Sequence, residues 1–293
     1  MARVSFADVK RVGIALAWIL LYAAIGVGIT IGISELVPGW GGQQWFVFRT
    51  GAFEVIGFLV ATIVVGKLLN KYSWDRMGWH TQPGGLMPRL LRGIGLGALM
   101  AMLAIGLACV IDRATVRFTG DWSVWPRVAV PLALGLVLAA LGEELMFRGY
   151  PLRRLADAIG ALPAMLILAV LFGIAHARNP NATFFSTVNV GLAAIWLSFA
   201  FFSSGGMPLA WGAHFGWNAA LAIVFDAPVS GYNFQVPVVE YTPGAHAWVD
   251  GGAFGPEGGI VATLALSAGI VYLLTRKDSF AELPEAVPAQ VAV

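Results

Sequence analysis

The chain has 293 residues, of which 58% are hydrophobic and only 12% are charged. Soluble globular proteins carry about 25% charged residues, so this composition excludes an ordinary soluble domain and indicates an integral membrane protein. The net charge is only +2 and no block of like charges occurs, which excludes a nucleic-acid binder and a disordered chain. A single cysteine, Cys109, excludes a disulfide scaffold.

Apolar runs with few or no charges recur along the whole chain. A helix needs about 20 apolar residues to cross a hydrocarbon core of roughly 30 Å. Eight runs approach or reach this length: 12–33, 51–66, 93–111, 128–147, 161–177, 183–203, 207–225 and 258–275. We therefore predict an all-α fold, a polytopic integral membrane helical bundle with about eight transmembrane helices. The first run is longer than the apolar core of a signal peptide, so we expect it to be a retained span.

The positions of Lys and Arg predict the orientation of these spans. With eight crossings, 13 of the 18 basic residues fall on the side of both termini and five fall on the other side. Cytoplasmic loops retain positive charge, so both termini are predicted to be cytoplasmic. We expect a multi-pass protein of a bacterial inner (plasma) membrane, with the lipid bilayer and no nucleic acid as a partner.

Two loops have a distinctive composition. Residues 112–127 mix charges with Trp122 and Trp125, which suits a segment at the level of the lipid headgroups. Residues 226–257 are rich in Gly and Pro and contain acidic residues without Lys or Arg, which predicts an outer loop. The chain then divides into 1–127 (three spans and the interfacial segment), 128–225 (core helices), 226–257 (outer loop) and 258–293 (last span and cytoplasmic tail).

Ionisable residues inside the predicted spans are few. Such residues are costly in a bilayer and by default mark a functional site or an internal pair. They are Glu54, Glu143, Glu144, His176 and His214, with the amide Asn218 close to the last of them. The remaining histidines, His80 and His246, fall in polar loops and are predicted to be surface groups.

The segment 141–155 (LGEELMFRGYPLRRL) contains two adjacent carboxylates. Glu143 and Glu144 point about 100° apart on a helix, whereas Glu144 and Arg148 are four residues apart and share a face. We predict that Glu144 pairs with Arg148, which leaves Glu143 free to act as a general base on water. The alternative is a solvated helix end with an ordinary ion pair.

Two further pairs, Phe172 with His176 and His214 with Asn218, also have the four-residue spacing of one helical face. A single histidine in an apolar helix usually serves packing, but two of them with an amide and a Glu pair predict a site in a cavity that opens to the cytoplasm. Straight helices place Glu143 about 10 Å and His176 about 21 Å from the cytoplasmic side, and tilt or a shifted helix end has to close that gap.

The ordered set Glu-Glu-x-x-x-Arg, Phe-x-x-x-His and His-x-x-x-Asn resembles the CPBP intramembrane protease family, which includes type 2 CAAX prenyl endopeptidases and Abi proteins. The resemblance covers about 128–225. It implies an intramembrane endopeptidase whose substrate is a peptide or a prenylated, lipid-associated protein. It also implies that Glu143 activates water, that His176 assists and that His214 and Asn218 stabilise the oxyanion. Glu144 and Arg148 would support the site.

Members of this family are commonly labelled metalloproteases, and Glu143, His176 and His214 are a candidate zinc set. The chain lacks His-Glu-x-x-His, the spacing that strongly predicts zinc, and we expect no tightly bound metal. The alternative function is a catalytically silent membrane scaffold or bacteriocin-immunity protein. A transporter would need charged groups in several spans, and only Glu54 points to that.

Overall fold

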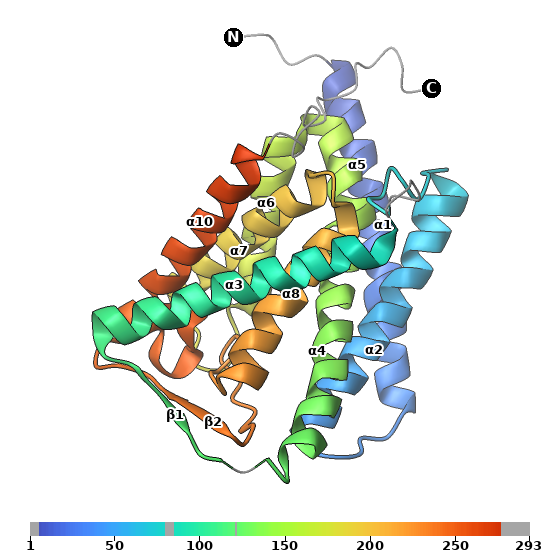
Figure 1. Cartoon of the computed structure of the whole chain (residues 1–293). Coiled ribbons are helices and arrows are strands. Elements are labelled where there is room, and N and C mark those ends of the chain that lie inside the picture. The colour runs from blue at the N-terminus through green and yellow to red at the C-terminus, as the bar shows by residue number, and fades with distance from the viewer. Residues whose placement is uncertain (1–5, 80–84, 121, 277–293) are drawn as a thin grey trace.

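The computed structural model of the chain describes residues 6–79, 85–120 and 122–276, and it is predominantly helical (Figure 1). The predicted surface residue His80 and the predicted cytoplasmic tail after Arg276 lie outside the described residues. The long helices are α1 (Phe6–Leu36), α2 (Gln43–Ala61), α3 (Leu86–Asp112), α4 (Trp125–Phe147), α5 (Gly149–Ile159), α6 (Ala161–His176), α7 (Phe184–Phe202), α8 (Gly206–Ala219) and α10 (Ile260–Thr275). Two π-helical segments extend them: η1 (Thr62–Leu69) follows α2, and η2 (Ala220–Val224) follows α8.

Each of the eight predicted apolar runs coincides with a helix, which confirms the all-α membrane bundle. By length and hydropathy, five helical segments of the described chain could cross a membrane: Phe6–Leu36, Trp45–Leu69, Leu86–Asp112, Trp125–Ile159 and Phe184–Phe202. α6 and α10 are shorter apolar helices. The count of eight spans therefore stays a prediction.

The fourth span continues further than the sequence predicted. Residues 148–160 were expected to be a loop, but α5 follows α4 after a break at Arg148, where φ is −107° and ψ is −114°. The next residue, Gly149, has a φ of +24°, a conformation that costs glycine little. α5 is amphipathic, with polar residues among its apolar ones, so hydropathy alone did not reveal it.

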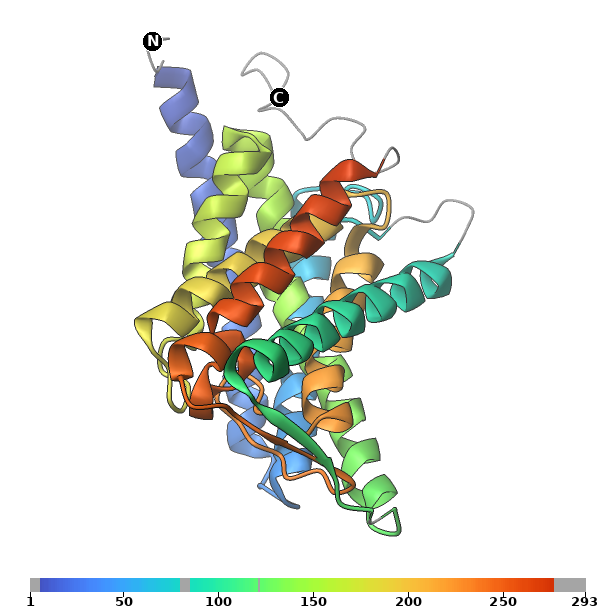
Figure 2. The same ribbon diagram turned by 60° about the vertical axis from the view of Figure 1, so that its left-hand side comes forward.

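α3 runs obliquely across α8 (Figures 1 and 2), and glycines stand where the two backbones meet. The contact residues form two Gly-x-x-x-Gly motifs, Gly93 with Gly97 on α3 and Gly212 with Gly216 on α8. A Cβ atom at Gly97 would lie 2.0 Å from the backbone oxygen of Ala213. Small residues at this spacing let membrane helices approach closely, and here they fix the position of α8.

The segment predicted to lie at the headgroups and the predicted outer loop pair with each other. β1 (Thr115–Phe118) is antiparallel to β2 (Val239–Thr242). The rest of the loop contains α9 (Ala247–Asp250) and two 3₁₀ turns, η3 (Gly252–Phe254) and η4 (Pro256–Gly258). His246 has an exposed side chain, as predicted, and its backbone N–H and Nδ1 lie 2.7 and 2.6 Å from the carboxylate of Asp112. The loop is therefore anchored to the end of α3.

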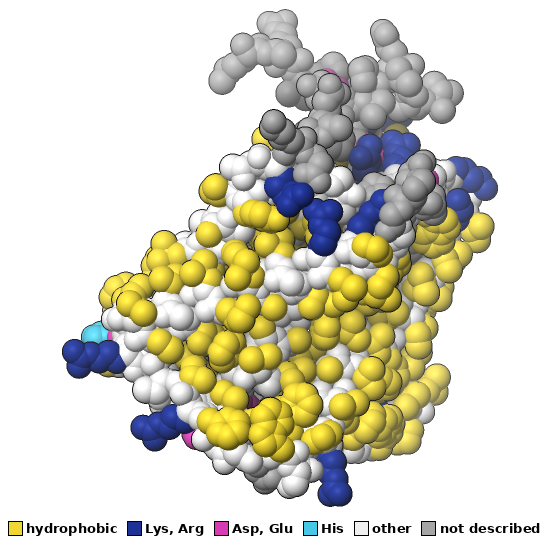
Figure 3. Space-filling model, viewed as in Figure 1, with side chains coloured by type: hydrophobic (Ala, Val, Ile, Leu, Met, Phe, Trp, Pro, Cys, Tyr) yellow, Lys and Arg dark blue, Asp and Glu magenta, His cyan; other side chains and the backbone are white. Residues whose placement is uncertain are grey.

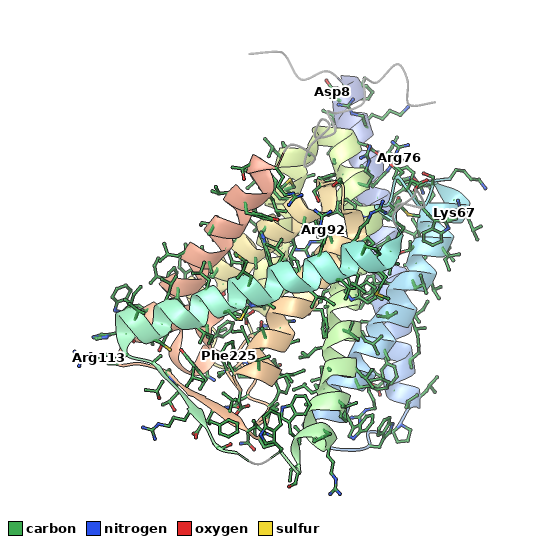
Figure 4. All side chains as sticks on the ribbon, in the orientation of Figure 1. Asp8, Lys67, Arg76, Arg92, Arg113 and Phe225 are labelled. Carbon is green, nitrogen blue, oxygen red and sulfur yellow. The ribbon has the colours of Figure 1, made fainter. Side chains whose placement is uncertain are left out.

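The start of α1 and the end of α10 lie at the same end of the molecule (Figure 1). Lys67 and Arg76 are at this end, whereas Arg113 is at the opposite end (Figure 4). Between the two ends, hydrophobic side chains cover much of the face seen in Figure 3. Leu20 and Ile31 of α1 are also exposed, at 69% and 54%. A broad apolar surface between two charged ends is the pattern of a multi-pass membrane protein.

Candidate active site

A cavity of about 480 Å³ lies among α2, α4, α6, α7 and α8. Most of its wall is apolar, with aromatic and aliphatic side chains from all five helices. Its polar lining residues are Thr50, Glu54, Glu143, His176, Asn179, Asn189, His214, Asn218, Ser230 and Glu257. Four of the six predicted site residues are in this set, and the other two, Glu144 and Arg148, lie directly behind it.

Glu143 is the residue on which the two histidines converge. Its Oε2 atom is 3.7 Å from Nε2 of His176 and 3.8 Å from Nε2 of His214. The side chain of Glu143 is 26% exposed, and its Oε2 atom has no hydrogen-bond partner among the described residues. A carboxylate and two imidazoles from three different helices therefore face one small volume.

Glu144 points away from the cavity, as the angular offset predicted, and forms a buried network. Its Oε1 atom accepts a hydrogen bond from Arg148 at 2.9 Å and lies 2.9 Å from Nδ1 of His214. The guanidinium of Arg148 also donates to the backbone oxygen of Ala194 on α7 and stacks over the ring of Phe172, 4.8 Å from its centroid. Glu144 and Arg148 are 0% and 1% exposed. Their ion pair is internal, which overturns the reading of a solvated helix end.

Hydrogen bonds also orient both imidazole rings. Nδ1 of His176 lies 2.8 Å from the backbone oxygen of Phe172, and this carbonyl can only accept, so Nδ1 carries a proton. By the same argument, the carboxylate of Glu144 places a proton on Nδ1 of His214. In their neutral forms both rings therefore present the lone pair of Nε2 to Glu143.

Asn218 lies one helical turn beyond His214 on α8 and lines the same cavity. Phe172 packs between the two histidines, with ring centroids 4.6 Å from His176 and 6.2 Å from His214. All six predicted site residues and Phe172 therefore gather in one region, although they lie up to 75 residues apart in the sequence.

The depth mismatch predicted from the sequence does not exist in the structure. That estimate ended the fourth helix near Tyr150, but α5 carries the span on to Ile159. From that end Glu143 is about 24 Å deep, and His176 is about 22 Å from the start of α6. The unrecognised helix α5 accounts for the error.

The cavity is also not placed as expected relative to the termini. Its lining loop residues, such as Asn179 and Ser230, belong to the connections 177–183 and 225–259. These connections lie at the end opposite the start of α1 and the end of α10 (Figure 2). The sequence interpretation had the cavity opening on the side of both termini, whereas the loops that line it are at the other end.

Glu257 is a cavity residue that sequence reasoning assigned only to the outer loop. Its Oε1 atom accepts from Nε1 of Trp217 at 2.8 Å, and Oε2 accepts from the backbone N–H and hydroxyl of Ser230. Asn189 on α7 donates to the backbone oxygens of Glu257 and Gly259 at 3.0 and 2.8 Å. The loop thus forms the floor of the cavity. The sequence signal for Glu257 was that it is an acidic residue in a Gly-rich loop without Lys or Arg.

The candidate zinc set, Glu143, His176 and His214, comes together in the cavity. Among the described residues, no group of three His, Cys, Asp or Glu side chains is arranged to hold a metal ion, and this includes Glu143, His176 and His214. The expectation that the protein binds no metal tightly stays a prediction, and the roles proposed below use these side chains alone.

Fold and site together define a helical membrane protein with a Glu and His cluster in an internal cavity. Residues 125–220 match the family described as Rce1-like, type II CAAX prenyl endopeptidase. The matched segment is about a third of the chain, contains all six predicted site residues and confirms the resemblance based on their motifs. It indicates an intramembrane endopeptidase. No curated protein matches the chain.

Proposed function

We propose that the protein is an intramembrane endopeptidase that hydrolyses a peptide bond of a lipid-associated protein with a water activated by Glu143. The observation that carries this proposal is the convergence of Glu143 with His176 and His214 inside a cavity. Amide hydrolysis needs a base for water and hydrogen-bond donors for the developing oxyanion. The site has candidates for both.

Glu143 and His176 together can orient the water. The carboxylate and the lone pair of Nε2 both accept hydrogen bonds, and a water between them satisfies both by donating its two protons. Glu143 takes one proton as the water oxygen bonds to the carbonyl carbon, and it returns that proton to the leaving nitrogen as the C–N bond breaks. This assignment gives His176 the role of orienting the water.

His214 and Asn218 stabilise the oxyanion in this proposal. Asn218 donates through its side-chain amide. His214 can donate from Nε2 only when both ring nitrogens are protonated, and the Glu144 carboxylate at 2.9 Å stabilises that imidazolium, as a carboxylate does for a catalytic histidine elsewhere. Arg148 in turn holds Glu144, so Glu144 and Arg148 act through His214.

The test is Glu143→Gln, which preserves the shape of the side chain and removes the base. We expect hydrolysis of a membrane-bound peptide substrate by the purified protein to fall at least about 100-fold. Asn218→Ala should lower kcat by about 100- to 1,000-fold, the usual cost of one oxyanion donor. Glu35→Gln, at an exposed position on α1, is the matched control and should retain full activity.

Wild-type turnover by a folded Glu143→Gln protein would refute the mechanism. If that variant also retained its role in cells, the protein would act as a scaffold or immunity protein. Zinc analysis and activity with and without a chelator test the metal question separately. We expect turnover that does not depend on zinc, and stoichiometric zinc with chelator-sensitive turnover would contradict this.

A further inference from the structure

The charged side chains that the structure places in the lining of the cavity are acidic. Among the described residues that line it are three carboxylates, Glu54, Glu143 and Glu257, and no Lys or Arg. The guanidinium of Arg148, behind the cavity, is already engaged by Glu144 and the backbone of α7. Because a charge in an apolar enclosure is costly unless it is paired, each carboxylate needs a partner to stay ionised.

Two of these carboxylates have an evident role. Glu257 receives hydrogen bonds from Trp217 and Ser230 and thereby holds the floor of the cavity. Glu143 is the proposed base, and its hydrogen-bond partner in the proposed mechanism is the attacking water. Neither carboxylate therefore needs a cation from outside the protein.

Glu54 is different, because the described residues offer it no hydrogen bond or ion pair. It lies on α2, is half-buried and faces the same cavity as Glu143, with which it interacts as a like charge. Gly142, next to Glu143 on α4, makes room for it: a Cβ there would lie 2.8 Å from Cβ and 3.1 Å from Oε2 of Glu54. The acid is thus pressed against the helix that carries the proposed base.

We propose that Glu54 binds a cationic side chain of the substrate, so that the protein cleaves peptides with a Lys or Arg close to the scissile bond. This inference rests on the proposed function and specifies its substrate class. A cationic side chain would neutralise Glu54 beside Glu143. The apolar remainder of the wall suits the methylene stem of Lys or Arg, which packs along apolar surface while its charged end reaches a partner.

Binding is measured first, because it does not require turnover. A fluorescent, lipid-anchored peptide is prepared in three forms, with Lys, Gln or Glu at one position that is moved along the sequence. With Glu143→Gln protein, we expect the best Lys peptide to bind about tenfold more tightly than its Gln form. The added substitution Glu54→Gln should reduce this ratio below about threefold, whereas Glu35→Gln should leave it unchanged. Thermal unfolding of each variant confirms that it is folded.

Turnover is then measured with the wild-type protein and the same peptides. The expected result is a preference in kcat/KM for Lys over Gln over Glu that Glu54→Gln abolishes. Equal turnover of all three forms would overturn the inference and leave the endopeptidase intact. Lys-selective binding through Glu54 without any cleavage would support the cation site and refute the proposed function. A preference that persists in Glu54→Gln would also overturn the inference.

Discussion

Glu144, Arg148 and His214 act as one unit at the scale of single residues. One oxygen of Glu144 contacts both partners at 2.9 Å, and both charged residues are almost fully buried. Such a pair adds little net stability, because its desolvation offsets its attraction. The pair instead fixes the orientation of the His214 ring relative to Glu143.

Arg148→Met is expected to destabilise the protein by about 3–5 kcal/mol, because it leaves Glu144 as a buried charge with one partner fewer. Thermal or denaturant-induced unfolding in detergent measures this. Arg153→Gln is the control: Arg153 also forms an ion pair four residues along its helix, with Asp157, but its side chain is 27% exposed. We expect a loss of no more than about 1 kcal/mol there, and equal losses would contradict the burial argument.

The limits of sequence reasoning are visible in this unit. The pairing of Glu144 with Arg148 is a local consequence of helix geometry, so the four-residue spacing predicted it correctly. The contact between Glu144 and His214 joins residues 70 apart, and spacing carries no information about it. The sequence motifs predicted that these residues belong to one site. The packing of α4 against α8 shows which of their atoms are in contact.

At the scale of helices, the close crossing of α3 and α8 governs the site, because α8 carries His214 and Asn218. The glycines on both sides leave no room for a Cβ: one at Gly212 would lie 2.2 Å from the backbone oxygen of Leu90, and one at Gly216 would lie 2.2 Å from that of Ile94. Moving α3 away would therefore move α8 and change the distances on which the proposed chemistry depends.

Gly97→Ala is expected to force the two helices apart and to reduce both thermal stability and activity, the latter by about 10- to 100-fold from misplacement of the site. Gly106→Ala is the matched control on the same helix, since a Cβ there meets nothing within 4 Å. Alanine has the better helix propensity by about 1 kcal/mol, so the control should be neutral or stabilising. Equal effects of the two substitutions would show that the crossing is not close.

The secondary structure was predicted with unequal success for physical reasons. Long apolar runs must be helical in a bilayer, because the backbone has no other way to satisfy its polar groups, and every run proved to be a helix. α5 was missed because its polar residues interrupt the hydropathy pattern. The pairing of β1 with β2 was missed because the two strands are more than 100 residues apart.

At the scale of the whole molecule, the basic residues and the cavity lie towards different ends. One of the 13 basic residues counted for the terminal side, Arg148, turns out to be buried in the site rather than exposed in a loop. The excess at that side remains large without it. If both termini are cytoplasmic, as this excess predicts, the loop floor of the cavity faces away from the cytoplasm.

Cysteine labelling tests this orientation. In a Cys109→Ala background, single cysteines replace Lys71, in the exposed connection after η1, and Asn233, in the exposed part of the cavity loop. In intact cells, an impermeant maleimide should label the cysteine at 233 and spare the one at 71. Labelling of 71 alone would reverse the topology, and labelling of both or neither before lysis would contradict two separate sides.

The Gly- and Pro-rich segment 226–257 also matters to protein engineering. Its composition suggests a suitable site for inserting an epitope tag or a fluorescent protein, because loops of this composition usually tolerate inserted residues. Glu257, Ser230 and Asn189 instead bind this segment to the helices of the site. An insertion there would disturb the wall of the candidate active site, so a reporter that keeps the protein native belongs elsewhere.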